Sequence, residues 1–141
     1  MRLKPHTKFV FTELPYFKMW WDRAEADKKD SLRAWVKEGR WEFLNGGWST
    51  NDETCPSYQD IIANMMKGHE FLKKEFDFIP KAAWLMDSAT HSATNARLYA
   101  DMGLETLFLG KLSQNEMGAR TKEKSLNFLW KPAMKNFGHQ K

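Results

Sequence analysis

The sequence predicts an α/β fold of the β-α-β type, because short apolar runs alternate with longer amphipathic segments along its 141 residues. The apolar runs are nearly continuous, which is typical of strands that are buried on both faces of a parallel sheet. Turn residues such as Gly39, Gly46 and Gly103 separate these segments. We therefore expect alternating strands and helices with a mainly parallel sheet.

The first part of the chain predicts two strands joined by helical structure. Residues 8–13 form an apolar run that ends in a carboxylate and predict the first strand. Residues 14–38 place apolar side chains at helical spacing, and Gly39 is a suitable stop after them. The charged stretch 22–30 leaves open whether this region forms one helix or two. Residues 41–44 predict the second strand.

The remaining chain predicts three strands and three helices in alternation. The strands are expected at residues 82–86, 106–109 and 127–130, and the helices at 57–76, 92–102 and 114–124. Ser57 and Ser92 stand where their side chains could cap the first two of these helices. We expect one domain over residues 1–131, followed by a loose C-terminal tail over residues 132–141.

Composition excludes several classes of protein. Hydrophobic residues make up 42% and charged residues 28% of the chain, which indicates a folded domain rather than a disordered tail. The net charge of +4 comes from 22 basic and 18 acidic residues that are interleaved, so we expect a solvated surface and no nucleic-acid partner. Since no apolar stretch approaches the length of a membrane span, we expect no membrane partner. The N-terminus shows no hydrophobic signal region, and the compartment is left open.

Two residue types have more than one interpretation. The single cysteine, Cys55, rules out a disulfide within the chain and a zinc site built from cysteines. Because the sequence places no base near it, we expect Cys55 to be a small buried residue rather than a nucleophile. The seven tryptophans and ten phenylalanines suit a bulky core, but they also suit the lining of a sugar site.

Carboxylates follow the ends of the predicted strands. Asp87 comes directly after the third strand, Glu13 ends the first, and Asp52 and Glu53 lie on the loop after the second. Because the carboxyl ends of parallel strands meet at one edge, these groups are expected to share a rim suited to acid/base or metal chemistry. A carboxylate before a helix also often serves as a cap, and loop carboxylates are often merely solvated, so both interpretations stay open.

His91 lies four residues after Asp87. A histidine near a carboxylate can orient it, act as a base or bind a metal. A histidine in a loop is also commonly a cap or a surface residue. The sequence alone does not separate these roles.

Three segments resemble those of the glycoside hydrolase family 38 α-mannosidases, and they occur in the family's order. The segment from Asn45 to Glu53 is similar to the family's Gly-Gly-Trp and Asn-Asp-Glu signature. Upstream, the run Phe9–Glu13 and the pair Trp20-Trp21 resemble the same family. The pattern Trp84-x-x-Asp87-x-x-x-His91-Ser92 resembles its nucleophile segment. Together the similarity covers roughly residues 4–131.

The resemblance implies part of an irregular (β/α) barrel and a retaining, zinc-dependent hydrolase of terminal α-mannosides in oligosaccharides and N-glycans. Asp87 would be the nucleophile that attacks the anomeric carbon, and it would also be a ligand of Zn²⁺. The chain departs from the family at Ser88-Ala89-Thr90, where Pro-Phe-Gly is usual. Members of the family work in the lysosome, the Golgi or the cytosol, depending on the branch.

The resemblance further implies that the 141 residues are an internal fragment. The family's His-x-Asp zinc motif would precede the matched region, and its acid/base aspartate and last zinc histidine would follow it. Because one ligand does not hold zinc, we expect the chain alone to be inactive. Open strand edges favour self-association. The alternative is a non-catalytic carbohydrate- or protein-binding module, which exposed Trp48 and Trp84 would favour.

Overall fold

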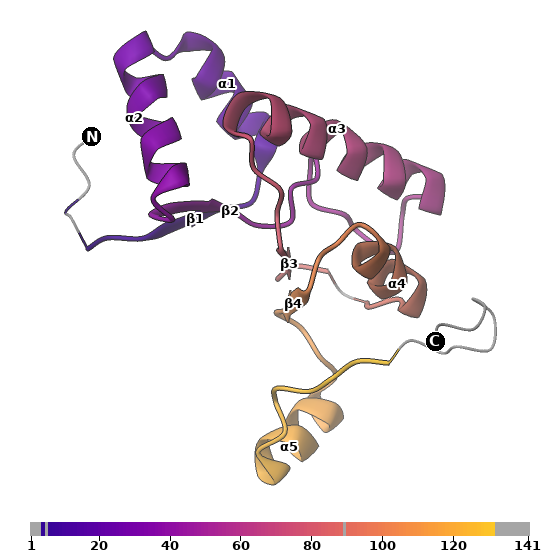
Figure 1. Cartoon of the computed structure of the whole chain (residues 1–141). Coiled ribbons are helices and arrows are strands. Elements are labelled where there is room, and N and C mark those ends of the chain that lie inside the picture. The colour runs from indigo at the N-terminus through magenta and orange to yellow at the C-terminus, as the bar shows by residue number, and fades with distance from the viewer. Residues whose placement is uncertain (1–3, 5, 89, 132–141) are drawn as a thin grey trace.

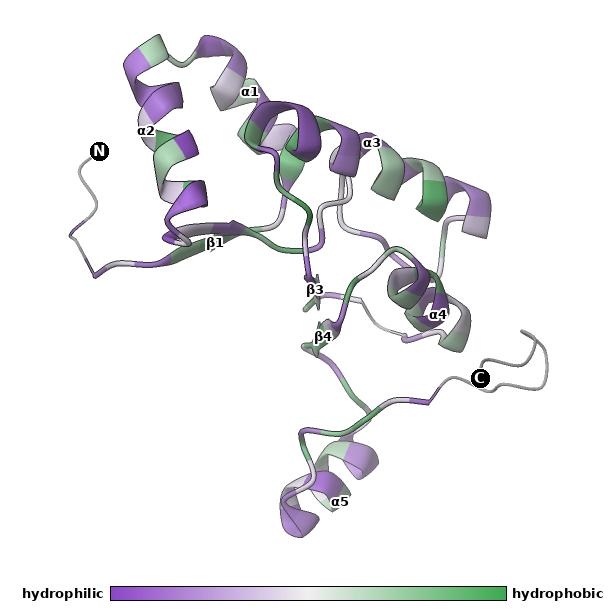
Figure 2. Ribbon diagram, viewed as in Figure 1, coloured by the Kyte–Doolittle hydropathy of each residue, from purple (hydrophilic) through white to green (hydrophobic). Residues whose placement is uncertain are grey.

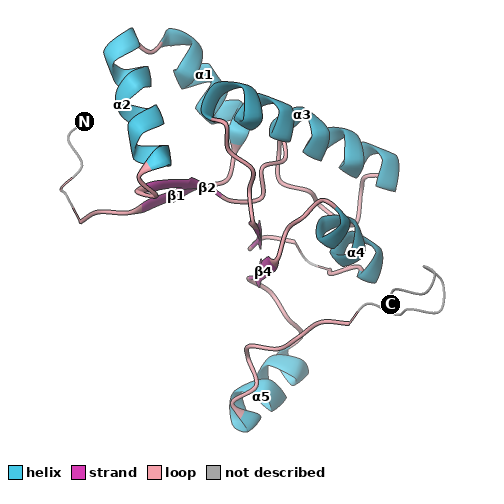
Figure 3. Cartoon of the chain, in the orientation of Figure 1, coloured by secondary structure: helices cyan, strands magenta, loops and turns pink. Residues whose placement is uncertain are grey.

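The computed structural model describes residues 4, 6–88 and 90–131, and within them it shows alternating strands and helices (Figures 1 and 3). The strands are β1 (Phe9–Phe11), β2 (Trp41–Phe43), β3 (Ala82–Leu85) and β4 (Thr106–Leu109). The helices are α1 (Leu14–Arg23), α2 (Ala26–Lys37), α3 (Tyr58–Phe76), α4 (Ala93–Asp101) and α5 (Gln114–Glu123). The predicted α/β fold class is confirmed.

The four strands form two parallel pairs. In the first pair Phe9 of β1 lies opposite Trp41 of β2, and in the second Ala82 of β3 lies opposite Thr106 of β4. The backbone N–H of Asn45, just beyond β2, donates to the carbonyl oxygen of Ala82 at 2.7 Å and so joins the two pairs. The strands therefore follow one another in chain order, as expected for consecutive parallel β-α-β units. Closure into a barrel stays a prediction.

Local sequence signals account for the helix ends. The predicted helical region 14–38 forms two helices. Ala24 and Glu25 have extended backbone angles and separate α1 from α2. Ser57 caps α3 as predicted, since its hydroxyl accepts from the backbone N–H of Asp60 at 3.3 Å. The Asp60 carboxylate returns the interaction by accepting from the backbone N–H of Ser57 at 3.2 Å. This reciprocal capping box satisfies backbone groups that the helix itself leaves unpaired.

The predicted fifth strand over residues 127–130 is wrong. These residues are irregular, and Leu129 remains 83% exposed. Phe128 instead lies against α5, with the guanidinium carbon of Arg120 3.7 Å from its ring centroid. A strand forms only where its backbone pairs with a neighbouring backbone, whereas the contact of Phe128 is with a side chain of α5. The predicted tail, residues 132–141, lies outside the described residues.

Aromatic residues dominate a core between α1, α2, α3 and β2. The Phe17 and Phe43 rings meet edge to face with centroids 4.9 Å apart, and Phe43 is completely buried. The buried members of this cluster are Leu14, Phe17, Trp21, Leu32, Val36, Phe43, Phe71 and Leu72. Figure 2 shows that the helices carry both hydrophilic and hydrophobic residues, as amphipathic helices on a core do.

A second cluster joins α3, β3 and α4, but the strands are only partly covered. The buried residues here are Met65, Ala83, Leu85, Tyr99 and Leu104. Phe9, Val10 and Phe108 remain 43%, 47% and 45% exposed, so the expected burial on both faces of the sheet is incomplete in this chain. Exposed apolar side chains on strands favour contact with further polypeptide, and self-association stays a prediction. Among the described helices, none has the length and apolarity that crossing a bilayer requires.

Helix α3 touches the loop after β2 at Gly68. A Cβ on this residue would lie 1.9 Å from the carbonyl oxygen of Gly46 and 2.7 Å from the carbonyl carbon of Gly47. The contact atoms are backbone, so neither partner can swing aside. The absence of a side chain at Gly68 therefore lets the loop lie directly on the helix.

Gly68→Ala is expected to lower the free energy of unfolding by about 2–3 kcal/mol, because the added methyl group forces the helix and the loop apart. Urea unfolding followed by tryptophan fluorescence measures this. The matched control is Gly118→Ala in α5, where an added Cβ meets nothing within 4 Å. That change is expected to be neutral or to stabilise by up to about 1 kcal/mol. Equal stability of the Gly68→Ala variant and the unmodified chain would contradict the close approach.

Candidate active site

Asp87 lies at an open rim beside the loop that follows β2. It comes two residues after the end of β3, and it is exposed to solvent. The neighbouring Ser88 is only 5% exposed, and its hydroxyl donates to the carbonyl oxygen of Asn51 at 3.1 Å. The structure thus brings Asp87 next to the segment that carries Asp52 and Glu53, as the sequence predicts.

An asparagine on α3 fixes the loop in this position. The side-chain oxygen of Asn64 accepts from the backbone N–H of Ser49 at 2.9 Å. Its amide nitrogen donates at 2.8 Å both to the carbonyl oxygen of Ser49 and to the side-chain oxygen of Asn51. The side chain of Asn51 in turn donates to the hydroxyl of Tyr99 at 2.9 Å. Burial raises the pKa of the Tyr99 phenol, which keeps it neutral in this network.

The predicted rim carboxylates differ in their surroundings. Glu13 accepts a hydrogen bond from the hydroxyl of Thr50, which ties the end of β1 to the same loop. Asp52 is exposed and accepts from the hydroxyl and the backbone N–H of Thr54. These bonds, followed by one from the thiol of Cys55, hold the pKa of the Asp52 carboxyl below its ordinary value. Glu13 therefore links the end of β1 to this loop, whereas Asp52 stabilises a turn within it.

Cys55 is exposed, so the expected burial is wrong. It lies in a tight turn where its backbone N–H bonds to the carbonyl oxygen of Asp52 at 3.3 Å. That turn directs the thiol toward the Asp52 carboxylate, 3.4 Å away, rather than into a core. The hydrogen bond and the negative charge raise the pKa of the thiol, which disfavours a nucleophilic thiolate.

Asp52→Asn is expected to increase the rate of Cys55 alkylation by iodoacetamide severalfold at neutral pH. The substitution removes the negative charge that opposes ionisation, so the pKa of the thiol falls and more thiolate is present. Because Cys55 is the single cysteine, mass spectrometry reports its reaction directly. Asp101→Asn, a surface carboxylate on α4 paired with Arg97, is the matched control and should leave the rate unchanged. A pH–rate profile that does not move in the Asp52 variant would contradict the assignment.

His91 contacts Glu53 and Lys111. Its Nδ1 lies 3.7 Å from Oε1 of Glu53, and its Nε2 lies 2.7 Å from the carbonyl oxygen of Lys111. Because a carbonyl oxygen only accepts, Nε2 carries the hydrogen in this contact. The Glu53 side chain is 3% exposed and also accepts from the backbone N–H of Ser92, the residue that caps α4. The structure thus favours a structural role for His91 over that of a base beside Asp87.

Lys111 is the site residue that the sequence analysis missed. Its ammonium group donates to the carbonyl oxygen of Asp87 at 3.0 Å, across 24 positions of sequence. The available signal is topological: Lys111 follows the end of β4 by two residues, as Asp87 follows the end of β3. Residues at equivalent positions beyond adjacent parallel strands are neighbours at the sheet edge.

The described part of the chain does not form a complete metal site. No three or more histidine, cysteine, aspartate or glutamate side chains in it are grouped closely enough to hold an ion. Zinc in proteins takes three or four side-chain ligands. Asp87 can therefore contribute one ligand at most, and the described residues do not by themselves fit the predicted Zn²⁺.

The two tryptophans that would favour a binding module are half-buried. The ring of Trp48 is covered by the ammonium group of Lys67, 4.3 Å from its centroid, and meets the edge of Phe71. Trp84 packs beside Phe108 with centroids 5.7 Å apart. This arrangement provides no specific support for the alternative of a sugar-binding platform.

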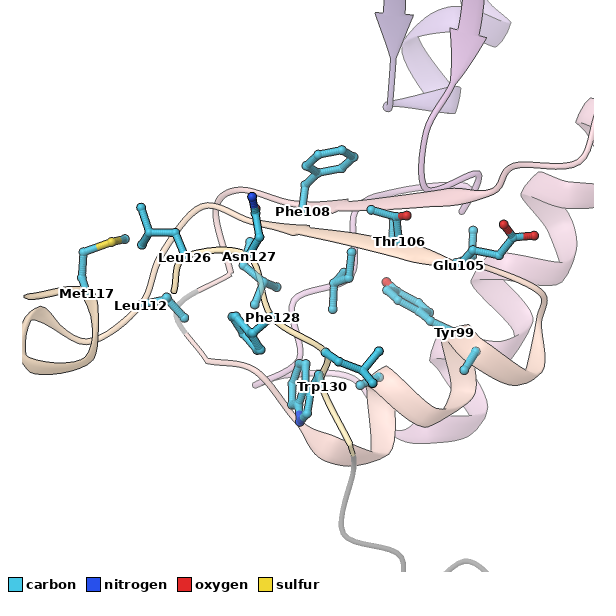
Figure 4. A pocket seen from close by; sticks show the side chains of 17 residues that line it. Tyr99, Glu105, Thr106, Phe108, Leu112, Met117, Leu126, Asn127, Phe128 and Trp130 are labelled. Atoms are coloured by element: carbon cyan, nitrogen blue, oxygen red, sulfur yellow. The ribbon is translucent and has the colours of Figure 1, made fainter. Parts of the chain in front are cut away.

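Two hollows border α5 and the segment that follows it. The first, of about 640 Å³, is lined mainly by apolar side chains of β4, α4 and residues 126–130, including Tyr99 and Phe128 (Figure 4). The second, of about 460 Å³, includes His91 and Lys111 among its lining residues. The second hollow therefore adjoins the residues that hold Asp87, whereas the first is a gap in the apolar packing.

The family follows from the sequence match over this fold and site. The family profile described as "Glycosyl hydrolases family 38 N-terminal domain" matches residues 1–136. The chain belongs to this family. The family 38 resemblance of its three motifs is thereby confirmed, and the motifs lie at the rim described above or in β1 and α1 beside it.

Known family 38 relatives are much longer than this chain. It is 38% identical over 128 residues to a probable alpha-mannosidase of Arabidopsis thaliana, and this match covers 90% of this chain and 12% of the relative. It is 35% identical over 127 residues to the lysosomal alpha-mannosidase of Dictyostelium discoideum, covering 90% and 13%. It is 36% identical over 135 residues to the alpha-mannosidase of Canavalia ensiformis, covering 95% and 14%. The chain thus spans well under a fifth of the length of these relatives.

A solved structure supports the fold. The 4-alpha-glucanotransferase of Thermococcus litoralis superimposes with a TM-score of 0.61 over 79% of this chain and 19% of its own. The two sequences are 18% identical, so the likeness concerns the arrangement of the backbone alone.

Proposed function

We propose that this chain forms the nucleophile-bearing part of the active site of a retaining α-mannosidase, with Asp87 as the nucleophile. The observation that carries the proposal is the setting of Asp87. Its side chain is exposed at the rim, while its carbonyl oxygen and the next residue are held by Lys111 and Asn51. The chain belongs to family 38, and the relatives named above are alpha-mannosidases.

The proposed chemistry uses the exposed carboxylate of Asp87. One of its oxygens attacks the anomeric carbon, the bond from that carbon to the leaving oxygen breaks, and a glycosyl ester of Asp87 results. Water then cleaves the ester and returns the sugar with its original anomeric configuration. The substrates would be terminal α-mannosides of oligosaccharides or N-glycans.

The other rim carboxylates are poor candidates for the acid that protonates the leaving oxygen. Glu53 is buried against Ser92, and the side chains of Glu13 and Asp52 accept hydrogen bonds within the loop after β2. We therefore assign the acid, and every Zn²⁺ ligand other than Asp87, to residues outside the described part of the chain. When bound, Zn²⁺ would supply a Lewis acid that grips the sugar hydroxyls.

A segment exchange tests the proposal. Residues 4–131 replace the matched segment of the Dictyostelium discoideum lysosomal alpha-mannosidase, and the folded chimera is assayed with an aryl α-mannoside. Activity is expected, with the α-anomer of mannose released first, as proton NMR of the product shows. The 141-residue chain alone is expected to release no aryl alcohol. A folded chimera without activity would refute the proposal, as would turnover by the isolated chain that survives Asp87→Asn.

A further inference from the structure

A line of contacts crosses the rim and ends on the backbone of Asp87. The Nδ1 of His91 lies 3.7 Å from Oε1 of Glu53, which is close enough for an ion pair with the charged imidazole but too far for a hydrogen bond. Its Nε2 donates to the carbonyl oxygen of Lys111 at 2.7 Å. The ammonium group of Lys111 then donates to the carbonyl oxygen of Asp87 at 3.0 Å. We infer that Glu53 is a positioning residue that fixes the place of Asp87 through His91 and Lys111. This inference rests on the proposed function and deepens it.

The burial of Glu53 is the first argument. Its side chain is 3% exposed, whereas Asp52 beside it and Asp87 across from it are exposed. Burying a carboxylate carries a large desolvation cost unless charge-assisted hydrogen bonds offset it. Glu53 obtains such a bond from the backbone N–H of Ser92, at the positive end of the α4 dipole.

Capping of α4 accounts for only one of the two carboxylate oxygens of Glu53. The hydroxyl of Ser92 already caps the helix by accepting from the backbone N–H groups of Thr94 and Asn95 at 3.1 and 3.4 Å. Glu53 adds a bond one residue earlier, and its other carboxylate oxygen faces His91. Glu53 therefore contacts Ser92 and His91 at the end of the segment that joins β3 to α4, and Asp87 lies near the start of this segment.

The Lys111 side chain is the least constrained group in this line of contacts. It is exposed, and a long, exposed ammonium side chain holds a geometry poorly unless its own backbone is fixed. The bond from His91 fixes that backbone at the carbonyl oxygen, directly beside the Lys111 side chain that reaches Asp87. A displacement of a reacting group by about 1 Å can cost about 10²-fold in rate.

Nuclear magnetic resonance of the 141-residue chain gives the first test. In Glu53→Ala the amide of Ser92 is expected to exchange about tenfold faster with solvent, beyond any change in global unfolding. Glu53→Gln keeps an acceptor oxygen and should stay near the unmodified rate. The carbonyl ¹³C resonance of Asp87 is expected to shift in Glu53→Ala and His91→Ala, as it does when Lys111→Met removes its donor. If Glu53→Ala changes the exchange rate at Ser92 but not the carbonyl resonance of Asp87, Glu53 is only a helix cap and the inference is wrong.

Kinetics of the chimera described above give the second test. A fluorinated mannosyl fluoride that traps the glycosyl-enzyme counts the competent sites, so kcat is expressed per titrated site. Misplacement of Asp87 in Glu53→Ala and His91→Ala is expected to lower this kcat about 10²-fold with little change in KM. In His91→Gln the amide can still donate to Lys111, and about tenfold of the loss should be recovered.

The matched control is Glu105→Ala, which removes a carboxylate at the other end of β4, where Glu105 pairs with Lys81. It is expected to leave kcat per site unchanged. Loss of folded protein alone would lower the number of titrated sites but not their kcat. An unchanged kcat per site in Glu53→Ala would overturn the inference. If the unmodified chimera is inactive the proposed function fails, and the Asp87 carbonyl resonance still decides whether the contacts act together.

Discussion

Asp87→Asn is expected to reduce hydrolysis of aryl α-mannosides by the family 38 chimera by about 10⁴-fold or more, a size typical of removing a nucleophile. The amide is nearly isosteric but cannot form the glycosyl ester. Because Asp87 is exposed and its carbonyl oxygen, not its carboxylate, contacts Lys111, the loop should keep its conformation. Release of the aryl alcohol measures the effect, and circular dichroism checks the fold.

A chemical rescue separates a nucleophile from a residue that only binds. In Asp87→Ala the missing carboxylate leaves room for azide, which is expected to restore cleavage and to yield mannosyl azide of inverted configuration. In the unmodified chimera the fluorinated trapping sugar should label the peptide that contains Asp87. Asp101→Asn on the surface of α4 serves as the control and should keep full activity. Label on another carboxylate would remove Asp87 from the proposed role.

The predictable parts of this fold are those that local sequence determines. The cap of α3 at Ser57 and the helix stop at Gly39, whose φ is 66°, follow from residues within a few positions. The break at Ala24 and Glu25 is one of the two alternatives that the sequence leaves open. Strand pairing is not local. The apolar run at 127–130 resembles β4 in composition, yet it forms no strand, because composition does not determine whether the backbone comes to lie along a neighbouring strand.

The site also has parts that the sequence predicts and parts that depend on distant segments of the chain. Asp87 could be placed at the rim from sequence, since it lies just beyond an apolar run that forms β3. Lys111 and Asn64 could not be assigned, because their contacts depend on how two loops and a helix lie against each other in space. The expected burial of Cys55 is wrong because the absence of a nearby base in the sequence says nothing of exposure, and the turn that holds the residue lies at the surface.

One departure from the family pattern has a structural consequence. By the resemblance Ser88 stands where the family's nucleophile segment would have proline, and its buried hydroxyl donates to the carbonyl oxygen of Asn51. Proline has no donor to offer there. In this chain the link between the two rim segments therefore includes a hydrogen bond.

The largest expected effect on stability is that of Phe43→Ala. Phe43 is the last residue of β2, is completely buried, and meets the rings of Phe17, Phe76 and Phe78 at 4.9, 5.2 and 6.0 Å between centroids. Its truncation leaves a cavity bounded by three helices, which cannot all close on it, and is expected to cost about 3–5 kcal/mol. Against a total of about 5–15 kcal/mol for ordinary domains, that loss is a large fraction of the free energy of unfolding.

Phe108→Ala on β4 is the matched comparison, because it replaces the same residue type at an exposed position. Phe108 is 45% exposed and packs mainly beside Trp84, so Phe108→Ala is expected to change the free energy of unfolding by less than about 1 kcal/mol. Urea unfolding of both variants, with tryptophan fluorescence as the signal, makes the comparison. Because Phe43 immediately precedes the loop that starts at Leu44 and reaches the rim, its loss should also weaken the hold on Asn51 and Glu53. Equal losses at the two positions would mean that the core between the helices and β2 is not packed as described.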